Sequence, residues 1–193
     1  MGLHDAGWDV TGVDLSPQPR YPFRFVQANA LTFGLDGFDL IWASPPCQAH
    51  VSLRWMYNAK AHVSLIEPIR QRLRGMGIPY VIENVPSAPL LSPVRLCGTA
   101  FNLGTVDAEL WRHRHFEASF PLVGAPCRHR RKPRVIGVYG GHGRDRRRSQ
   151  NGLDFPPTAR KEAMGIDWMT SLELSQAIPP VYSSFIARQL REP

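Results

Sequence analysis

The sequence lacks any long hydrophobic run: no stretch approaches the ~20 apolar residues that a membrane-spanning helix requires. No secretory signal peptide opens the chain. Cysteine is scarce as well, with 3 among 193 residues, widely separated and odd in number. Such a set does not make a disulfide framework. These absences predict a protein of the reducing cytoplasm that does not associate with membranes.

Acidic residues are also in short supply, with 16 Asp and Glu against 23 Lys and Arg, which gives a net charge of +7. An excess of this sign indicates a polyanionic partner such as nucleic acid. The remaining composition, 43% hydrophobic and 20% charged, is that of an ordinary globular protein with one domain. The basic side chains form two clusters, Arg128, Arg130, Arg131, Lys132 and Arg134, and then Arg144, Arg146, Arg147 and Arg148.

Cys47 follows a predicted strand that two prolines bring to an end. Residues 40–43 are apolar and have the length of a buried strand in a parallel sheet. Pro45 and Pro46 cannot donate hydrogen bonds to a neighbouring strand, so the strand must end before them. Cys47 is therefore predicted at the carboxyl end of a strand, the edge at which open α/β sheets bind ligands. The alternative is a small buried residue near a turn.

A second apolar stretch, residues 79–85, ends in Glu83 and Asn84 and is closed by Pro86. The order Pro-Pro-Cys-Gln and then Glu-Asn-Val resembles the DNA cytosine-5 methyltransferases, where these are the nucleophile loop and the glutamate motif. Arg112-His113-Arg114 is similar to the Arg-x-Arg motif of that family, and residues 158–163 and 176–180 are similar to its last two motifs. The likeness covers nearly the whole chain and is to small, phage-type members.

The resemblance implies a Rossmann-like, class I methyltransferase fold with a mostly parallel sheet, and S-adenosylmethionine as cofactor. Asp14 ends a predicted strand at residues 10–13 and matches the residue that accepts hydrogen bonds from the ribose hydroxyls. Asn29 stands where the family often has an aspartate, and it can accept through its amide oxygen without charge. The full set of matching cofactor residues is Asp14, Leu15, Asn29, Ala30 and Pro45.

One part of the family pattern is missing. Residues 1–3 match those that follow the glycine-rich loop, so the first strand and this loop are absent from the sequence. The two strands that would flank the missing one are expected to have unpaired backbone groups. We expect the true start to lie upstream; the alternative is a degenerate, catalytically deficient DNA-binding relic.

In the chemistry that the resemblance implies, the Cys47 thiolate adds to C6 of cytosine and makes C5 reactive. Glu83, protonated or sharing a proton, would hold N3. Arg114 would contact O2 of the base, and Arg112 a neighbouring phosphate. Double-stranded DNA is the expected partner, with the target base flipped out of the helix. The residues expected to contact DNA are Gln48, Arg130, Arg131, Arg144 and Arg146.

Three regions are predicted along the chain. Residues 1–123 form the catalytic core, residues 124–157 a short basic target-recognition region, and residues 158–193 helices that return to the core. Further helices are predicted at residues 60–75, with Val63, Ile66, Ile69 and Leu73 on the apolar face, and around 159–164 and 180–190. A monomer is expected.

Two other functions remain open at this point. His113, His115, Cys127 and His129 are zinc-capable, which suggests a zinc-binding nucleic-acid protein. Their spacing fits no common zinc class well and overlaps the arginine motif, so no metal ligand is assigned. The family's chemistry could also deliver a substituent other than methyl to C5.

Overall fold

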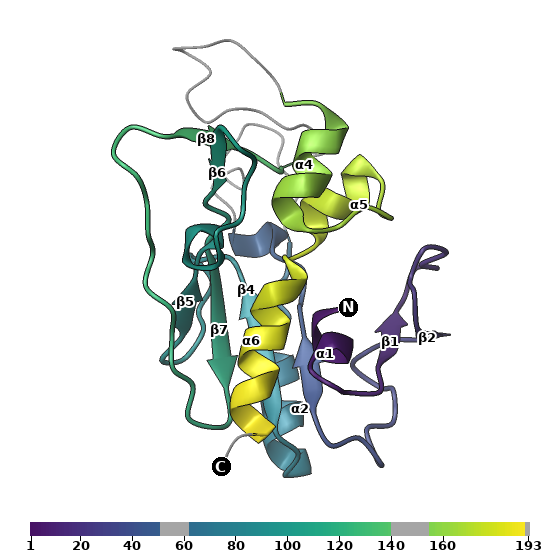
Figure 1. The fold of residues 1–193 in the computed structure, drawn as a ribbon. Coiled ribbons are helices and arrows are strands. Elements are labelled where there is room, and N and C mark those ends of the chain that lie inside the picture. Colours follow the sequence, from purple (N-terminus) through teal and green to yellow (C-terminus); the bar gives the residue numbers. More distant parts are fainter. Residues whose placement is uncertain (51–61, 140–154, 192–193) are drawn as a thin grey trace.

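The computed structural model describes residues 1–50, 62–139 and 155–191. Within these ranges the chain is mixed α/β, as the sequence predicted (Figure 1). None of the described helices is both long enough and apolar enough to cross a membrane. The elements in chain order are α1 (Gly2–Asp5), β1 (Thr11–Asp14), β2 (Arg24–Gln27), β3 (Ile41–Ala43), η1 (Gln48–His50), α2 (Ile66–Met76), β4 (Tyr80–Asn84), β5 (Val94–Leu96), η3 (Gly98–Phe101), β6 (Ala108–Leu110), β7 (Arg114–Ala118), β8 (Arg134–Ile136), α4 (Pro157–Met164), α5 (Ser171–Gln176) and α6 (Pro180–Arg191).

The largest sheet has the strand order β3-β4-β7-β5. β3 and β4 run parallel, with Ala43 opposite Ile82, whereas β7 is antiparallel to both β4 and β5. The prediction of a mostly parallel sheet is therefore wrong for this sheet, which is mixed. The reason lies in the connection: a parallel neighbour needs a long crossover, usually a helix. Between β4 and β7 the chain forms only short strands and the 3-10 helix η3.

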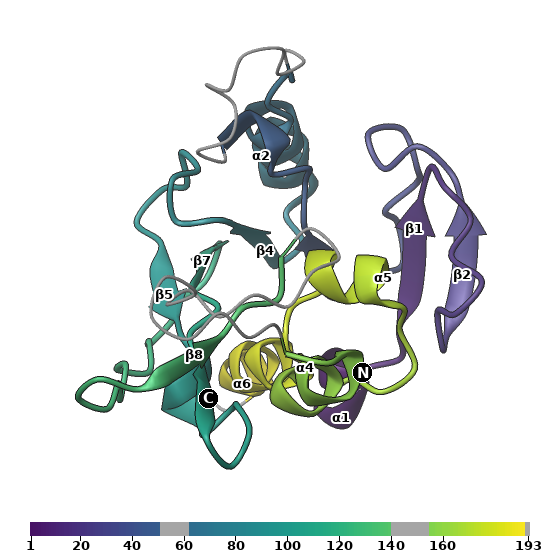
Figure 2. The ribbon, with the colours of Figure 1, turned by 90° about the horizontal axis from the view of Figure 1, so that it is seen from above.

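β1 and β2 form a separate parallel sheet, with Asp14 opposite Gln27. Figure 2 shows this pair to one side of the larger sheet. Among the described residues no strand joins β1 to β3. Residues 41–43 were expected to be buried but are only half-buried, because β3 has a hydrogen-bonded neighbour on one edge alone.

The β1–β2 pair is held to the rest of the protein at three places. Helix α1 packs closely against α6: a Cβ atom on Gly2 would lie 1.9 Å from the carbonyl oxygen of Pro180, so only glycine fits there. Arg20, in the β1–β2 connection, forms a 2.8 Å ion pair with Glu173 of α5. Arg72 of α2 donates to the carbonyl groups of Ala30 and Phe33, just after β2.

The predicted C-terminal helix is confirmed as α6, and it covers the larger sheet. Its Tyr182 and Ile186 are fully buried against Val81 of β4, Leu96 of β5 and Phe116 of β7. The Tyr182 ring lies edge-on to Phe116, with centroids 6.1 Å apart. Burial of these apolar groups is the main stabilising contribution available to the helix.

A second hydrophobic core lies beside β6 and β8, which pair in parallel with Leu110 opposite Ile136. Helices α4 and α5 cover it with Met164 and Leu174, both about 1% exposed or less. This core takes residues from all three regions predicted along the sequence. Ile136 and Val138, in the predicted region 124–157, therefore pack with residues of the other two regions, and β8 has β6 as its hydrogen-bonding partner.

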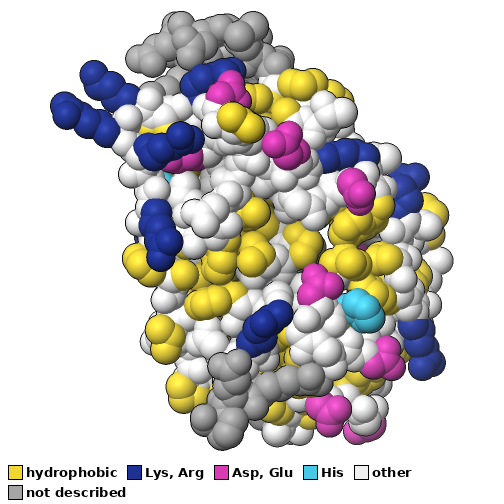
Figure 3. Space-filling model, viewed as in Figure 1, with side chains coloured by type: hydrophobic (Ala, Val, Ile, Leu, Met, Phe, Trp, Pro, Cys, Tyr) yellow, Lys and Arg dark blue, Asp and Glu magenta, His cyan; other side chains and the backbone are white. Residues whose placement is uncertain are grey.

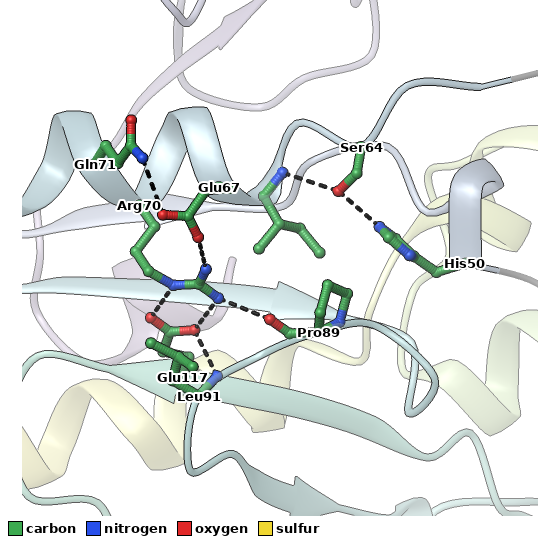
Figure 4. Close-up of polar contacts among 9 residues, drawn as sticks. His50, Ser64, Glu67, Arg70, Gln71, Pro89, Leu91 and Glu117 are labelled. Carbon is green, nitrogen blue, oxygen red and sulfur yellow. Dashed lines mark hydrogen bonds and ion pairs between the residues drawn. The ribbon is translucent and has the colours of Figure 1, made fainter.

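Helix α2 is confirmed, but it begins at Ile66, and Val63 before it is 83% exposed. The sequence pattern placed Arg70 away from the apolar face, yet Arg70 is buried. Figure 4 shows the cause: its guanidinium reaches the Glu117 carboxylate of β7 and the Pro89 carbonyl oxygen. An apolar periodicity does not distinguish a solvated arginine from one whose charge is paired inside the protein.

Candidate functional site

The parallel pairing of β3 with β4 brings the two predicted motifs to the same edge of the sheet. With Ala43 opposite Ile82, the residues that follow each strand continue side by side. The Asn84 amide donates to the carbonyl oxygen of Pro45 at 2.9 Å, and both residues are buried. The proline loop is thereby anchored to the carboxyl end of β4, where Glu83 lies.

Cys47 is half-buried and leads into η1. Its carbonyl oxygen accepts from the backbone N–H of His50 at 2.8 Å. The His50 ring is buried, with Nε2 3.0 Å from the Ser64 hydroxyl just before α2 (Figure 4), and the Ser87 hydroxyl donates to the His50 carbonyl oxygen. The loop that carries Cys47 is therefore fixed from β4 on one side and from α2 on the other.

Glu83 is a buried carboxylate, 7% exposed, at the end of β4. Burial raises the pKa of Glu83 above its ordinary value, and the charge of Arg114, a hydrogen bond from Ser44 and the charge of Arg112 offset this only in part. The Arg114 Nε atom lies 3.1 Å from Glu83 Oε1. A buried carboxyl with a raised pKa keeps its proton to a higher pH than an exposed one, which suits it to donate a hydrogen bond in its protonated form.

The two arginines of the Arg-x-Arg motif have different surroundings, and one predicted role needs correction. Arg112 is 1% exposed and donates to the carbonyl groups of Val138, Ser175 and Ala177. A guanidinium held by backbone carbonyls inside the protein cannot contact a DNA phosphate as expected. Burial and the neighbouring Arg114 lower the pKa of Arg112 to about 9, so it remains charged at neutral pH.

The predicted cofactor residues divide between two places. Asp14 and Asn29 are exposed near the ends of β1 and β2, and each side-chain oxygen accepts a local backbone N–H, from Ser16 and Leu31 respectively. Leu15 and Ala30 beside them are also exposed. Pro45 is buried in the loop after β3. Because β1 and β2 are parallel, Asp14 and Asn29 lie at the same edge of their sheet.

Of the predicted DNA contacts, Gln48 and Arg131 are exposed. Arg130 forms a 2.7 Å ion pair with Glu109, which was not identified from the sequence. Burial opposes the charge of Glu109, but hydrogen bonds from Trp111 and Arg130 overcome it and lower the pKa of Glu109. Figure 3 shows Lys and Arg side chains projecting at the β6–β8 end of the molecule. Arg144 and Arg146 lie outside the described residues.

The zinc-capable residues that come together in the structure differ by one from the set expected from the sequence. His113, Cys127 and His129 do come together, but His115 does not join them. It lies in β7 opposite Arg95 of β5, whose Nε lies 3.1 Å from His115 Nε2. Cys97 takes its place. Nothing in the sequence indicated that Cys97 belongs to this set, because no spacing rule connects it with residues thirty positions away.

Comparisons with known proteins do not identify the chain. No protein-family model matches it, and no curated protein does. Its function is therefore inferred from the residues and their geometry.

Proposed function

We propose that this chain is a DNA cytosine-5 methyltransferase that acts through a covalent bond between Cys47 and C6 of a flipped cytosine. One observation carries the proposal. A proline-bounded loop bearing Cys47 is hydrogen-bonded to the end of the strand that bears Glu83, a buried carboxyl with a raised pKa and an arginine partner. The order of these motifs in the sequence supports the same reaction.

In this mechanism the Cys47 thiolate adds to C6, and the electrons of the C5=C6 double bond shift through C4 to N3, which takes up a proton. The ring becomes an enamine whose C5 is nucleophilic. Bound S-adenosylmethionine would supply an electrophilic methyl group for the C5 nucleophile formed in this way. A base, which a water molecule could provide, then removes the C5 proton. The electron pair of that C–H bond restores the double bond and expels the Cys47 sulfur, so the enzyme is regenerated.

Glu83 would contact the edge of the cytosine ring that carries N3, opposite C6, to which the Cys47 sulfur adds. In its protonated form it donates to N3, where electron density increases as the thiolate adds. Its other oxygen can accept from the exocyclic amine, a group that cytosine has and thymine lacks. Arg114, held 3.1 Å from Glu83, would lie close enough to contact O2 of the same base. The pair would therefore select the base as well as activate it.

The ends of β1 and β2 would hold the adenosine part of the cofactor. Asp14 can accept hydrogen bonds from the ribose hydroxyls at the carboxyl end of its strand. Asn29 would lie near the adenine ring as an uncharged acceptor. DNA would be held by the exposed basic side chains, which offset the few kcal/mol that flipping a base costs.

A catalytically deficient DNA-binding protein is the second candidate. The observation that favours it is the separation of the β1–β2 sheet from the larger sheet, which divides the candidate cofactor residues from Cys47. Calorimetric titration with S-adenosylmethionine distinguishes the two candidates. Saturable micromolar binding supports the enzyme, and no heat at millimolar cofactor supports the binding protein.

The direct test is methyl transfer from radiolabelled S-adenosylmethionine to cytosine-containing DNA. Label should enter DNA with the natural chain and with Arg188→Ala, an exposed change on α6, but not with Cys47→Ala. Glu83→Gln should reduce the rate by about 10²–10⁴-fold. DNA containing 5-fluorocytosine should trap a covalent complex, because fluorine at C5 cannot leave as a proton does. Label transfer that persists in Cys47→Ala would refute the mechanism.

A further inference from the structure

Four metal-binding side chains converge from three separate parts of the chain. Cys97 precedes η3, His113 lies between β6 and β7, and Cys127 and His129 lie in the connection from β7 to β8. One potential ligand atom from each residue lies within 4.8 Å of the corresponding atoms of the other three. Within residues 1–50, 62–139 and 155–191, this is the group of three or more His, Cys, Asp and Glu side chains whose ligand atoms lie close enough to share one metal ion.

We propose that Cys97, His113, Cys127 and His129 bind one structural zinc ion. Two thiolates and two imidazoles are the ligand set of a common closed zinc site, and the two thiolate charges neutralise Zn²⁺. The site is separate from the Cys47–Glu83 site, and the proposal holds whether or not the chain is a methyltransferase.

Two sulfur–nitrogen distances in the group suit a tetrahedral ion. With Zn–S near 2.3 Å and Zn–N near 2.0–2.1 Å, adjacent sulfur and nitrogen ligands lie about 3.6 Å apart. Cys127 Sγ is 3.5 Å from His113 Nε2, and Cys97 Sγ is 3.1 Å from His129 Nε2. Both separations therefore need changes of only a few tenths of an ångström. The whole group is too compact for an iron–sulfur cluster, whose ligands are spread over more than one metal ion.

The surrounding residues fix the ligands, as is usual around a metal. The Trp111 ring stacks on the His129 ring with centroids 4.2 Å apart and planes at 10°. Trp111 Nε1 in turn donates to Glu109 at 2.9 Å, and Glu109 also accepts from the backbone N–H of Arg130. Cys97 is fully buried, so its position is set by the core. The imidazole of His129 is thus held in a defined place although the residue itself is exposed.

Zinc at this position would explain how the basic connection is ordered. Residues 119–133 form no helix or strand, yet they carry Arg128, Arg130, Arg131 and Lys132. Cys127 and His129 lie within this connection and would be tied to η3 and to the β6–β7 junction. His113 also lies directly between Arg112 and Arg114, so the same ion would fix the segment that places Arg114 beside Glu83. Metal binding would in this way contribute folding free energy to a connection that has no helix or strand of its own.

The test is metal content and the spectrum of the cobalt-substituted protein. The chain, produced with zinc and dialysed, should hold about one zinc ion by elemental analysis. Reconstitution with Co²⁺ should give the visible absorption of tetrahedral cobalt and a thiolate-to-metal band in the near ultraviolet. Cys127→Ser and His129→Asn change exposed residues, so both variants should fold. Their zinc affinity should fall by more than ~100-fold, which exceeds the loss expected when a residue that only supports a ligand is changed.

Two matched variants serve as controls. His115→Ala removes a nearby histidine that is not in the group, and Cys47→Ser removes a cysteine that lies in the loop after β3. Both variants should keep one zinc ion. Limited trypsin digestion gives a separate measurement: chelation should increase cleavage at Arg128, Arg130 and Arg131 in the natural chain and have no effect in Cys127→Ser. Absence of zinc, zinc retained at full affinity in Cys127→Ser, or a Cys97–Cys127 disulfide in protein purified under reducing conditions would each overturn the proposal.

Discussion

The Arg70 guanidinium lies side-on to the Glu117 carboxylate: Nε is 2.8 Å from Oε1, Nη2 is 2.8 Å from Oε2, and each side chain is 4% exposed. The pair joins α2 to β7 across the end of the larger sheet (Figure 4). The Arg70 guanidinium also donates to the Pro89 carbonyl oxygen and to the exposed Glu67 carboxylate, and the Leu91 N–H donates to Glu117. Folding removes both charges of this pair from water. Loss of one partner should therefore lower the free energy of unfolding more than it would for a pair on the surface.

Removal of one partner of this pair should be strongly destabilising. Arg70→Met leaves the Glu117 carboxylate buried without a counter-ion, and we expect a loss of about 3–5 kcal/mol of unfolding free energy. The double variant Arg70→Met/Glu117→Leu should cost less than the single change, because no unpaired charge remains. Urea denaturation measures both, and Arg74→Met, on the exposed side of the same helix, is the control. Equal losses for Arg74→Met and Arg70→Met would contradict the prediction.

Glu83 and Glu117 should contribute to stability with opposite pH dependence. The pKa of Glu83 is raised by burial, so its contribution is fully present below the unfolded value of about 4.3 and is lost as pH rises through its folded pKa. For Glu117 burial is outweighed by hydrogen bonds from Arg70 and Leu91, which lower the pKa. Its contribution is present above about 4.3 and is lost as pH falls.

Denaturation of the natural chain, Glu83→Gln and Glu117→Gln from about pH 3 to pH 7 measures this difference. As pH rises, the stability of the natural chain relative to Glu83→Gln should fall, and its stability relative to Glu117→Gln should rise. The two glutamates are matched, since each is buried, lies in a strand and has an arginine partner. Slopes of the same sign for both variants would show that one assignment is wrong.

Arg112 should behave as a structural residue and not as a DNA contact. Its three carbonyl acceptors lie at the C-terminal end of α5, at Ser175 and Ala177, and just after β8, at Val138. Arg112→Met therefore leaves these carbonyls without their donor and an internal space unfilled. We expect a loss of about 3–5 kcal/mol, since hydrogen bonds to a charged group are worth roughly 1.5–3 kcal/mol each and part of this is regained by water. Arg112→Lys should restore little, because one ammonium group cannot reach the same acceptors. A stable Arg112→Met variant that only weakens DNA binding would instead support the phosphate role.

Arg131 should behave in the opposite way. It is exposed in the connection between β7 and β8, and Arg131→Ala should leave unfolding free energy within about 0.5 kcal/mol of the natural chain. If it contacts a phosphate, the slope of log Kd against log salt should fall by about 0.9. Fluorescence anisotropy with a duplex at several salt concentrations measures the slope, and Arg188→Ala on α6 is the matched exposed control. A slope equal to that of the natural chain would remove Arg131 from the DNA surface.

The sequence by itself determined the local elements and the order of the motifs. Apolar runs indicate buried strands and the prolines after them end these strands, so the strands before Cys47 and through Glu83 could be placed without coordinates. The 3.6-residue periodicity did the same for α2 and α6. Where these elements begin and end depends on residues that are neighbours in the chain, so the local sequence is enough to predict it.

Only the tertiary structure decided which side chains are paired. Arg70 and Glu117, Arg112 and the Ala177 carbonyl, and Cys97 and His129 are each brought together by strand pairing over long separations in the chain. Whether a charged or metal-binding side chain is solvated, paired or gathered into a site depends on these long-range contacts, and no periodicity records them. For the same reason the antiparallel β7, which supplies Glu117 and Arg114, could not be placed from its own residues alone.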